Sequence, residues 1–402
     1  MGKVKIGVLG AQRGKVMIRF MLHYPEAELV AVCDKHPAAL GECRAEAEKA
    51  GVKVRFFSDF EQFLGCDMDA VILANYATEH TPYALRCFET GRHVLSEVMP
   101  AQTLGEAVQL VEAVEKSGLI YAYAENYCYM RAVLEMKRRY RRGDIGEFVY
   151  GEGEYVHDCT AEWEKLTGGD PNHWRNRAYA SFYLSHSLGP LVAITGCVPE
   201  RITAFETQQN RAMAEMGYRA ATAASVLVKM KNGAVVRALK GHLKRSVPSV
   251  WYSIYGDRGS MESDRFGKRT YMLSAYTEGE RPGEGDFSYY EPEREIDTPF
   301  SRSFESPEGH SGSDFYTCYY FLEKLLGRPG GQNCIDVYQA MDMSLPGILA
   351  YRSILSGGMP VEYPDLREPA ARERCRGDRA CTDPAVAGDA LLPARAGEQI
   401  KK

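Results

Sequence analysis

The first 125 residues alternate short apolar runs with amphipathic stretches. In Leu104–Lys116 the apolar residues recur at helical spacing, as they do in Glu79–Glu89. Buried apolar strands separated by such helices are typical of a parallel sheet covered on both faces. The pattern predicts an α/β domain over residues 1–126. Its strands are expected at Val4–Leu9, Leu29–Cys33, Ala70–Ala74, His93–Ser96 and Ile120–Ala124.

The hydrophobic period changes in the second part of the chain. Two runs rich in β-branched residues flank Asn232-Gly233, a dipeptide typical of a tight hairpin turn. This favours an α+β domain over residues 127–365 with a large, mostly antiparallel, open sheet. We expect strands at Phe148–Val156, Ala223–Lys231, Ala234–Leu239, Val250–Tyr255 and Ser260–Ser263. Helices expected at Asp314–Leu326 and Ile335–Leu355 return to the first domain.

The last segment, residues 366–402, differs from both domains. It is rich in charged residues, Ala and Pro, and it contains no aromatic residue. Such a composition predicts a poorly ordered or surface-draped tail.

The first expected strand runs into the turn Gly10-Ala11-Gln12-Arg13-Gly14. A glycine-rich turn between a strand and a helix lets backbone N–H groups approach a pyrophosphate. The alternative is a plain tight turn, since Gln12 stands where a middle glycine is usual. Asp34 ends the second strand, where an acidic side chain accepts hydrogen bonds from an adenosine ribose. The glycine-rich turn and Asp34 predict a dinucleotide site that favours NAD over NADP, because a carboxylate repels a 2′-phosphate. Lys35 and His36 follow immediately and weaken this preference.

Composition narrows the class of protein further. The 402 residues suggest two domains, and a net charge of −5 with interspersed signs argues against nucleic acid. No apolar run approaches the ~20 residues that span a bilayer, and Lys3–Leu9 reads as a strand rather than a signal peptide. Eleven cysteines without a CxxC pair are typical of thiols in a reducing compartment, so we expect a cytoplasmic protein. The nine histidines form no metal-ligand pattern, and no metal is expected.

One long motif carries a family resemblance, the stretch GRHVLSEVMPAQTLGEAVQLVEAVEKSG at residues 91–118. It resembles the Gfo/Idh/MocA family of NAD(P)-dependent sugar oxidoreductases. The resemblance implies that Glu97 contacts the nicotinamide ribose. Family members follow this Glu with a Lys that assists hydride chemistry, and here Val98 takes its place.

Five shorter motifs narrow the resemblance. They are AENYCY from Ala124, GEFVYGEGEYVHD from Gly146, HWR from His173, YLSHSLGP from Tyr183 and GHSGSDF from Gly309. In this order they resemble the NAD-dependent α-N-acetylgalactosaminidase branch, which is a glycoside hydrolase family. Thr160 and Ser311 depart from that branch's motifs, which suggests a different sugar.

The candidate catalytic residues are histidines and a tyrosine. His310 lies in a glycine-containing loop, and the resemblance implies that it protonates a leaving glycosidic oxygen; a solvent-exposed turn histidine is the alternative. His186 is the expected base, alone or with Tyr183, against a capping or core histidine.

The remaining candidates are binding residues. We expect cofactor contacts from Gly10, Gln12, Arg13, Gly14, Asp34, Asn75, Tyr76, His80, Glu97, Asn126, Trp174 and Arg175. We expect contacts to a small carbohydrate from Tyr155, His157, Tyr183, His186, Glu125 and Tyr129. A tyrosine and a histidine two apart on a strand share one face, which suits ring stacking and hydroxyl contacts; core packing is the alternative.

The resemblance implies NAD-dependent glycoside cleavage by oxidation at sugar carbon 3, elimination, water addition and re-reduction. A net sugar or inositol dehydrogenase is the first alternative, and a non-catalytic NAD-binding sensor is the second. In the family the outer sheet face commonly forms oligomers, so a homo-oligomer is expected. No nucleic-acid or membrane partner is expected.

Overall fold

A computed structural model describes residues 2–245, 249–265 and 272–398 of the chain. It divides into two compact units, built from separate stretches of sequence. The first unit comprises Met1–Gln102, Glu106–Tyr129 and Glu295–Ala340, and the second comprises Thr103–Gly105, Met130–Arg294 and Met341–Lys402. The chain passes from the first unit to the second between Tyr129 and Met130, and the domain boundary at residue 126 stays a prediction. The sequence did not indicate that all of residues 295–340 belong to the first unit.

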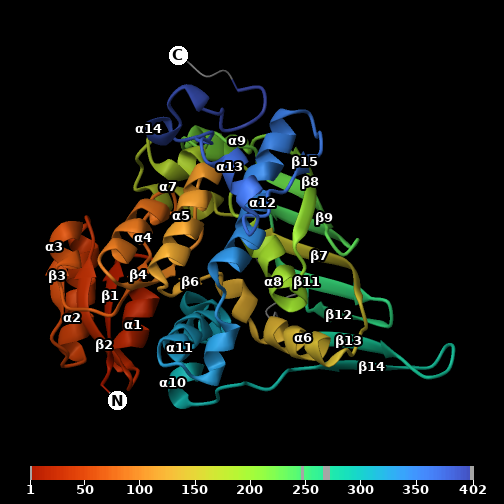
Figure 1. The fold of residues 1–402 in the computed structure, drawn as a ribbon, viewed down its shortest axis with the longest axis horizontal. Helices are drawn as coiled ribbons and strands as arrows, with labels where there is room; N and C mark the ends of the chain where they lie inside the picture. Colours follow the sequence, from red (N-terminus) through yellow and green to blue (C-terminus); the bar gives the residue numbers. More distant parts are fainter. Residues whose placement is uncertain (1, 246–248, 266–271, 399–402) are drawn as a thin grey trace. The chain divides into compact units, whose positions relative to one another are not determined.

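The first unit contains a six-stranded parallel sheet in the order β3-β2-β1-β4-β5-β6 (Figure 1). Its strands are β1 Val4–Leu9, β2 Ala27–Cys33, β3 Arg55–Phe57, β4 Ala70–Leu73, β5 His93–Ser96 and β6 Tyr121–Tyr123. Its connecting helices are α1 Lys15–His23, α2 Pro37–Lys49, α3 Phe60–Leu64, α4 His80–Glu89 and α5 Leu104–Ser117. The strand order reverses between β1 and β4, and this switch point is where open parallel sheets bind ligands. The predicted α/β fold is confirmed.

A later part of the chain returns to the first unit. It contains α10 Pro299–Arg302, η4 Pro307–Gly312, α11 Ser313–Leu325 and η5 Pro329–Asn333. Helix α11 packs against α1 and against η1 Asn126–Tyr129. Four phenylalanine rings fill the interface: Phe20, Phe300, Phe304 and Phe315, with centroids 5.3–6.0 Å apart. This packing fixes the start of α11, which carries part of the candidate site.

The second unit contains a nine-stranded sheet in the order β14-β13-β12-β11-β7-β10-β9-β8-β15. Among the described strand pairs of this sheet, β10–β7 is parallel and the others are antiparallel, so the predicted mostly antiparallel sheet is confirmed. The strands are β7 Phe148–Val156, β8 Pro199–Glu206, β9 Ala223–Met230, β10 Val235–Gly241, β11 Ser249–Gly256, β12 Gly259–Ser263, β13 Leu273–Glu278, β14 Gly285–Tyr290 and β15 Val361–Glu362.

Helix α8 Ser185–Thr195 packs on β7, β10 and β11, on the face of the sheet that we call the inner face, and α6 Arg131–Arg142 packs on α8. The unit's other helices include η2 Thr160–Glu162, α7 Trp163–Thr167, η3 Trp174–Arg177, α9 Arg211–Glu215 and the larger part of α12 Val337–Leu355. Helix α8 lies directly against β7. A Cβ atom at Gly153 would stand 1.8 Å from the Ser187 carbonyl oxygen, so only glycine permits this approach.

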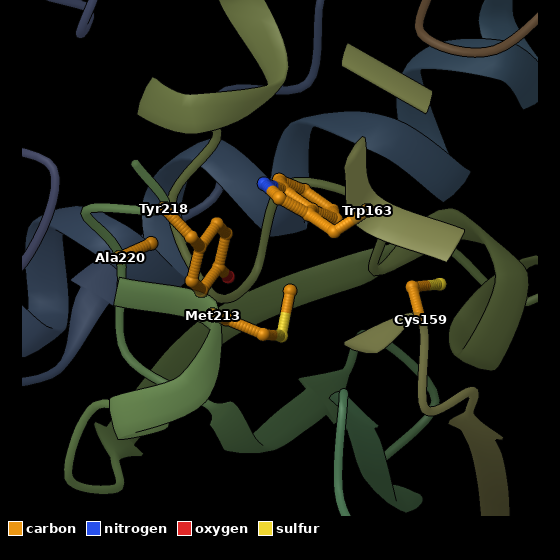
Figure 2. Packing of buried hydrophobic residues seen from close by; sticks show 5 residues of the cluster. All are labelled: Cys159, Trp163, Met213, Tyr218 and Ala220. Atoms are coloured by element: carbon orange, nitrogen blue, oxygen red, sulfur yellow. The ribbon is translucent and has the colours of Figure 1, made fainter. Parts of the chain in front are cut away.

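A small hydrophobic cluster lies in the core of the second unit. Figure 2 shows its members, which are Cys159, Trp163, Met213, Tyr218 and Ala220. The Trp163 and Tyr218 rings meet edge to face at 5.0 Å between centroids. The indole N–H donates to Asn176 Oδ1 at 2.9 Å, so the buried polar atom of the tryptophan is satisfied.

The final segment is folded rather than poorly ordered. Residues 366–398 include α13 Pro369–Cys375, α14 Pro384–Ala387 and η6 Gly388–Ala390. The Tyr351 hydroxyl donates to the Pro393 carbonyl, and Arg219 pairs with Glu398 at 2.9 Å. The alanines and prolines that suggested disorder instead form short helices on the second unit. None of the helices described is both long and apolar enough to cross a membrane.

Candidate functional site

The turn after β1 is built around two glycines. Gly10 has φ +97°, and a Cβ atom there would lie 2.3 Å from the Ala74 carbonyl group. A Cβ at Gly14 would lie 2.2 Å from the Gly10 carbonyl oxygen. Both positions exclude side chains, so the backbone stays open at the switch point of the sheet. Gln12 is exposed at the tip of this turn, where a side chain costs nothing.

Asp34 ties the end of β2 to the same turn. Its Oδ2 accepts the Ala11 N–H at 2.5 Å, and its Oδ1 accepts the His36 N–H at 2.8 Å. Each carboxylate oxygen keeps a further lone pair, so two hydroxyls of a ribose still find acceptors. Asp34 therefore fits the predicted ribose contact, and that contact stays a prediction.

The loop after β4 carries an unsatisfied amide. Both Asn75 side-chain polar atoms are buried, and neither has a hydrogen-bond partner among the residues described. Buried amides normally find partners, so Asn75 fits a cofactor-facing position. The neighbouring Tyr76 hydroxyl lies 3.4 Å from His36 Nε2. At the start of α4, His80 Nδ1 donates to the Met99 carbonyl at 2.8 Å, and burial lowers the pKa of this ring to about 4.

A buried charge network lies in the first unit. The Arg13 guanidinium donates to both carboxylate oxygens of Asp314, at 3.1 and 2.8 Å, and reaches Glu97 Oε1 at 2.7 Å. The Asn126 amide donates to Asp314 Oδ1 at 3.1 Å. Although burial opposes ionisation, Arg13 and His310 hold the pKa of Asp314 well below its usual range. Burial dominates at Glu97 and raises its pKa, against the attraction of Arg13.

His310 is positioned by this network. Its Nδ1 lies 2.7 Å from Asp314 Oδ2. A carboxylate only accepts, so Nδ1 carries the hydrogen and Nε2 remains the atom that can exchange a proton. His310 has φ 48° and ψ 49°, and Ser311 has φ 57°, which are left-handed conformations that non-glycine residues rarely adopt. Strain of this kind is found where a loop holds a side chain for function.

The sequence analysis missed Asp314. The available signal was its spacing of four residues after His310, at the first turn of a helix, where such pairs meet. Arg13 was expected at the cofactor; its guanidinium pairs with Asp314 and Glu97, and its contact with a cofactor stays a prediction. The Glu97 carboxylate, expected at the nicotinamide ribose, is therefore held by a partner from the glycine-rich turn.

In the second unit, four predicted substrate residues come together on the inner sheet face. At the end of β7 the Tyr155 hydroxyl lies 3.3 Å from His157 Nδ1. The Tyr155 ring meets His186 at 4.7 Å between centroids, and the Tyr183 and His186 rings stack at 5.5 Å with 3° between their planes. His186 lies in the first turn of α8, where Tyr252 donates its hydroxyl to the His186 carbonyl at 2.6 Å.

Trp174 and Arg175, predicted for the cofactor, lie in η3 of the second unit. The Arg175 guanidinium stacks 4.6 Å above the Trp174 ring. It also donates to the Tyr183 hydroxyl at 3.3 Å. The structure therefore associates Arg175 with the four substrate candidates, and its contact with a cofactor stays a prediction.

Two predicted substrate residues are packed into the first unit. Tyr129 is buried, donates its hydroxyl to the Asn333 carbonyl at 3.2 Å and packs on Tyr320. Glu125 is fully buried at the end of β6. Core packing, which was the alternative for Tyr155, explains the position of Tyr129. Within the described ranges no group of three or more metal-ligating side chains forms a metal site.

The glycine-rich turn after β1, Asp34 at the end of β2 and the parallel sheet together define an NAD-binding Rossmann domain. Residues 4–125 match the model of the Gfo/Idh/MocA oxidoreductase family, whose description is an NAD-binding Rossmann fold. The expected resemblance and the NAD cofactor are confirmed.

Comparison with curated proteins extends beyond this domain. The chain is 25% identical to a Glycosyl hydrolase family 109 protein of Stenotrophomonas maltophilia, covering 92% of this chain and 91% of that one. It is 25% identical to a protein of the same name in Saccharopolyspora erythraea, covering 90% and 83%.

Solved structures share the fold of the chain. An oxidoreductase of Agrobacterium radiobacter in complex with NAD+, L-tartaric acid and magnesium has a TM-score of 0.69 at 16% identity, covering 90% of this chain and 98% of that one. A levoglucosan dehydrogenase in complex with NADH has a TM-score of 0.71 at 16% identity, covering 90% and 100%.

Replacing Asp34 tests the predicted preference for NAD. The carboxylate accepts ribose hydroxyls and repels a 2′-phosphate. Asp34→Ser is expected to weaken NAD binding about tenfold, the loss of one charged hydrogen bond, and to improve NADP binding. Titration calorimetry with both cofactors measures the ratio, with the exposed Glu48→Ser as control. An unchanged NAD-to-NADP ratio would contradict the assignment.

Replacing Asp314 tests the buried charge network. Asp314→Asn removes the carboxylate that accepts two hydrogen bonds from Arg13 and leaves Glu97 as its partner, so we expect a loss of about 3 kcal/mol at pH 7. The lowered pKa of Asp314 means that the wild type keeps this stability above about pH 4 and loses it as the pH falls further. The two urea midpoints should therefore converge only below about pH 4. Exposed Asp389→Asn should match the wild type throughout. A variant as stable as the wild type at pH 7 would show that the network stabilises nothing.

Proposed function

We propose that this protein is an NAD-dependent glycosidase that cleaves a glycoside by transient oxidation at sugar carbon 3. Bound NAD would supply the acceptor for the carbon 3 hydride and return it after bond cleavage. Gly10, Gly14, Asp34 and Asn75 would hold this cofactor, as their open backbone, free lone pairs and unsatisfied amide support. Full-length similarity to proteins named Glycosyl hydrolase family 109 supports the class of reaction.

The observation that carries the proposal is the His310–Asp314 pair. The carboxylate fixes His310 Nδ1–H, so Nε2 can hold a proton and deliver it to a leaving glycosidic oxygen. A net dehydrogenase has no leaving group to protonate. The cleavage needs no pair of catalytic carboxylates, in contrast to ordinary glycosidases, because oxidation at carbon 3 acidifies the carbon 2 proton.

The residue after Glu97 also separates the two enzyme classes. The Val98 side chain is 8% exposed and has no group that can donate or accept a proton. The family resemblance implies a lysine at this position for hydride chemistry at a hydroxyl. In the second unit His186 and Tyr183 provide candidate groups that accept a hydroxyl proton. The Arg175 contact stabilises negative charge on the Tyr183 oxygen. Tyr155 and His157 would bind the sugar by stacking and by hydroxyl contacts.

Two other functions make different predictions. A sugar or inositol dehydrogenase of the Gfo/Idh/MocA type, with His186 as its base, is favoured by the dehydrogenases among the similar structures. It produces NADH in step with an oxidised sugar. A sensor binds NAD and turns over no sugar.

Aryl glycosides in D₂O, with NAD far below the glycoside concentration, distinguish the three functions. The glycosidase releases many phenols per NAD and places deuterium at carbon 2. His310→Gln is expected to slow release about 100-fold, the usual contribution of a general acid, while the exposed His23→Gln leaves it unchanged. Stoichiometric NADH with the glycosidic bond intact would overturn the proposal in favour of a dehydrogenase.

We also propose that the second unit's outer sheet face binds a second copy of this chain, and that the protein is cytoplasmic. The outer face is the one opposite α8. Strand registers place six large apolar side chains on it, each at least 40% exposed: Phe205, Leu227, Tyr255, Tyr276, Phe287 and Tyr289. Exposed apolar patches of this kind are typical of protein–protein interfaces. All eleven cysteines are free thiols, which supports a reducing compartment.

Introducing charged residues on the outer face tests whether this face forms the interface between two copies of the chain. The wild type is expected to run as two or more chains in light scattering after size exclusion. Leu227→Glu combined with Phe287→Glu should give monomers, because unpaired charges are costly in an apolar interface. Met359→Glu, which changes another exposed apolar residue, serves as the control. A monomeric wild type would refute this interface.

A further inference from the structure

Lys240 is a buried lysine that the proposed function does not use. It lies on β10, is 3% exposed and pairs in register with Tyr155 on β7. Its strand neighbour Leu239 belongs to the outer face, because register links it to Ser225, two residues from the exposed Leu227. Side chains alternate along a strand, so Lys240 and Tyr155 share the inner face.

The Lys240 ammonium is left with unfilled donor capacity. Among the residues described its one hydrogen-bond partner is His242, with Nζ and Nε2 3.4 Å apart. His242 Nδ1 lies 2.9 Å from the His157 carbonyl and must donate to it. Burial lowers the pKa of His242 to about 3, so the ring is neutral and Nε2 accepts from Lys240. Two of the three ammonium hydrogens remain.

No carboxylate in the described part of the chain forms an ion pair with Lys240. Asp158, just after the end of β7, accepts from Lys244 at 2.9 Å and from Thr160 at 2.5 Å. A second cation instead acts on the ammonium: Arg175, whose guanidinium is held by Trp174 and Tyr183. The polar side chains around Lys240 on the inner face therefore carry more positive than negative charge.

The surroundings of Lys240 also exclude water. His242 packs between the Trp163 and Tyr218 rings of the cluster in Figure 2, at 5.7 and 5.5 Å between centroids. Burial lowers the pKa of Lys240 to about 8, assisted by Arg175 and opposed by Cys159. The group is still mostly a cation at pH 7. A buried cation without a counter-ion lowers the stability of the free protein.

We propose that Lys240 binds an anionic substituent of the sugar, so that the substrates are acidic glycosides. The inference rests on the proposed function, which assigns Tyr155 and its partners His157 and His186 to the sugar. A carboxylate, a sulfate or a phosphate shares the required chemistry, since each accepts from an ammonium as a point charge. A neutral hydroxyl would accept one hydrogen and leave the charge uncompensated.

Matched aryl glycosides test the substrate class. For one ring configuration the panel contains the hexoside, the hexuronide, the 6-sulfate and the 6-phosphate, which separates the three anions. At least one anionic member is expected to exceed the neutral hexoside in kcat/KM. Lys240→Met should lower that value about 10- to 100-fold, the loss of a charged hydrogen bond, and leave the neutral hexoside unchanged. Lys229→Met, on the outer face, is the control.

A binding experiment keeps this inference separate from the proposed reaction. Calorimetry with the free hexose, uronate, hexose 6-sulfate and hexose 6-phosphate needs no bond cleavage. Anion binding that Lys240→Met abolishes supports the inference even if no glycoside is cleaved. Cleavage of neutral glycosides alone, with Lys240→Met fully active, overturns the inference and leaves the proposed function standing. Loss of NAD binding in Lys240→Met, with sugar binding retained, overturns the inference and indicates that Lys240 contacts the cofactor.

Thermal stability supplies a readout that a structural lysine would not give. Without ligand, Lys240→Met should melt at or above the wild-type temperature, because methionine fills the same space without a buried charge. The uronate, sulfate or phosphate that binds should raise the Tm of the wild type and not of the variant. A large drop in the Tm of Lys240→Met without ligand would show a structural role and overturn the inference.

Discussion

The buried carboxylate of Asp314 is the interaction on which the first unit's site depends. It receives two hydrogen bonds from Arg13, one from Asn126 and one from His310. These partners come from the glycine-rich turn, the end of the parallel sheet and a loop almost two hundred residues later in the chain. A fully buried carboxylate is tolerable only with such partners. The partners that this charge requires therefore bring the glycine-rich turn and His310 into one network, and Glu97 joins it through Arg13.

The regular elements could be predicted because their signal is local. The apolar runs that form β1, β2, β4, β5 and β6 are continuous, and the hairpin of β9 and β10 is marked by Asn232-Gly233. Strand β3 has only three residues, none of them fully buried, so no apolar run announced it. Composition left the tail as either poorly ordered or draped over the surface. It could not show that residues such as Cys375 and Cys381 are buried, because composition does not record contacts.

The candidate site was predictable only where one strand or one turn contains the signal. Tyr155 and His157 follow from strand alternation, and Asp34 follows from its place after an apolar run. Asp314 and Lys240 were missed because each owes its importance to what surrounds it. An aspartate at the start of a helix usually stabilises that helix, and a lysine in a strand usually faces water. Only the fold shows that one is encircled by donors and the other is buried beside a neutral histidine.

The two buried charges differ in a way that bears on function. Asp314 is ionised because the protein itself supplies its counter-charges, so its environment is complete without a ligand. Lys240 is cationic at neutral pH, while the residues around it supply one neutral acceptor and another cation. A site that leaves a buried charge uncompensated gives up stability, and a ligand that supplies the opposite charge recovers it on binding. Selectivity follows from the same physics, because a neutral sugar leaves the charge of the ammonium uncompensated, whereas an anionic sugar does not.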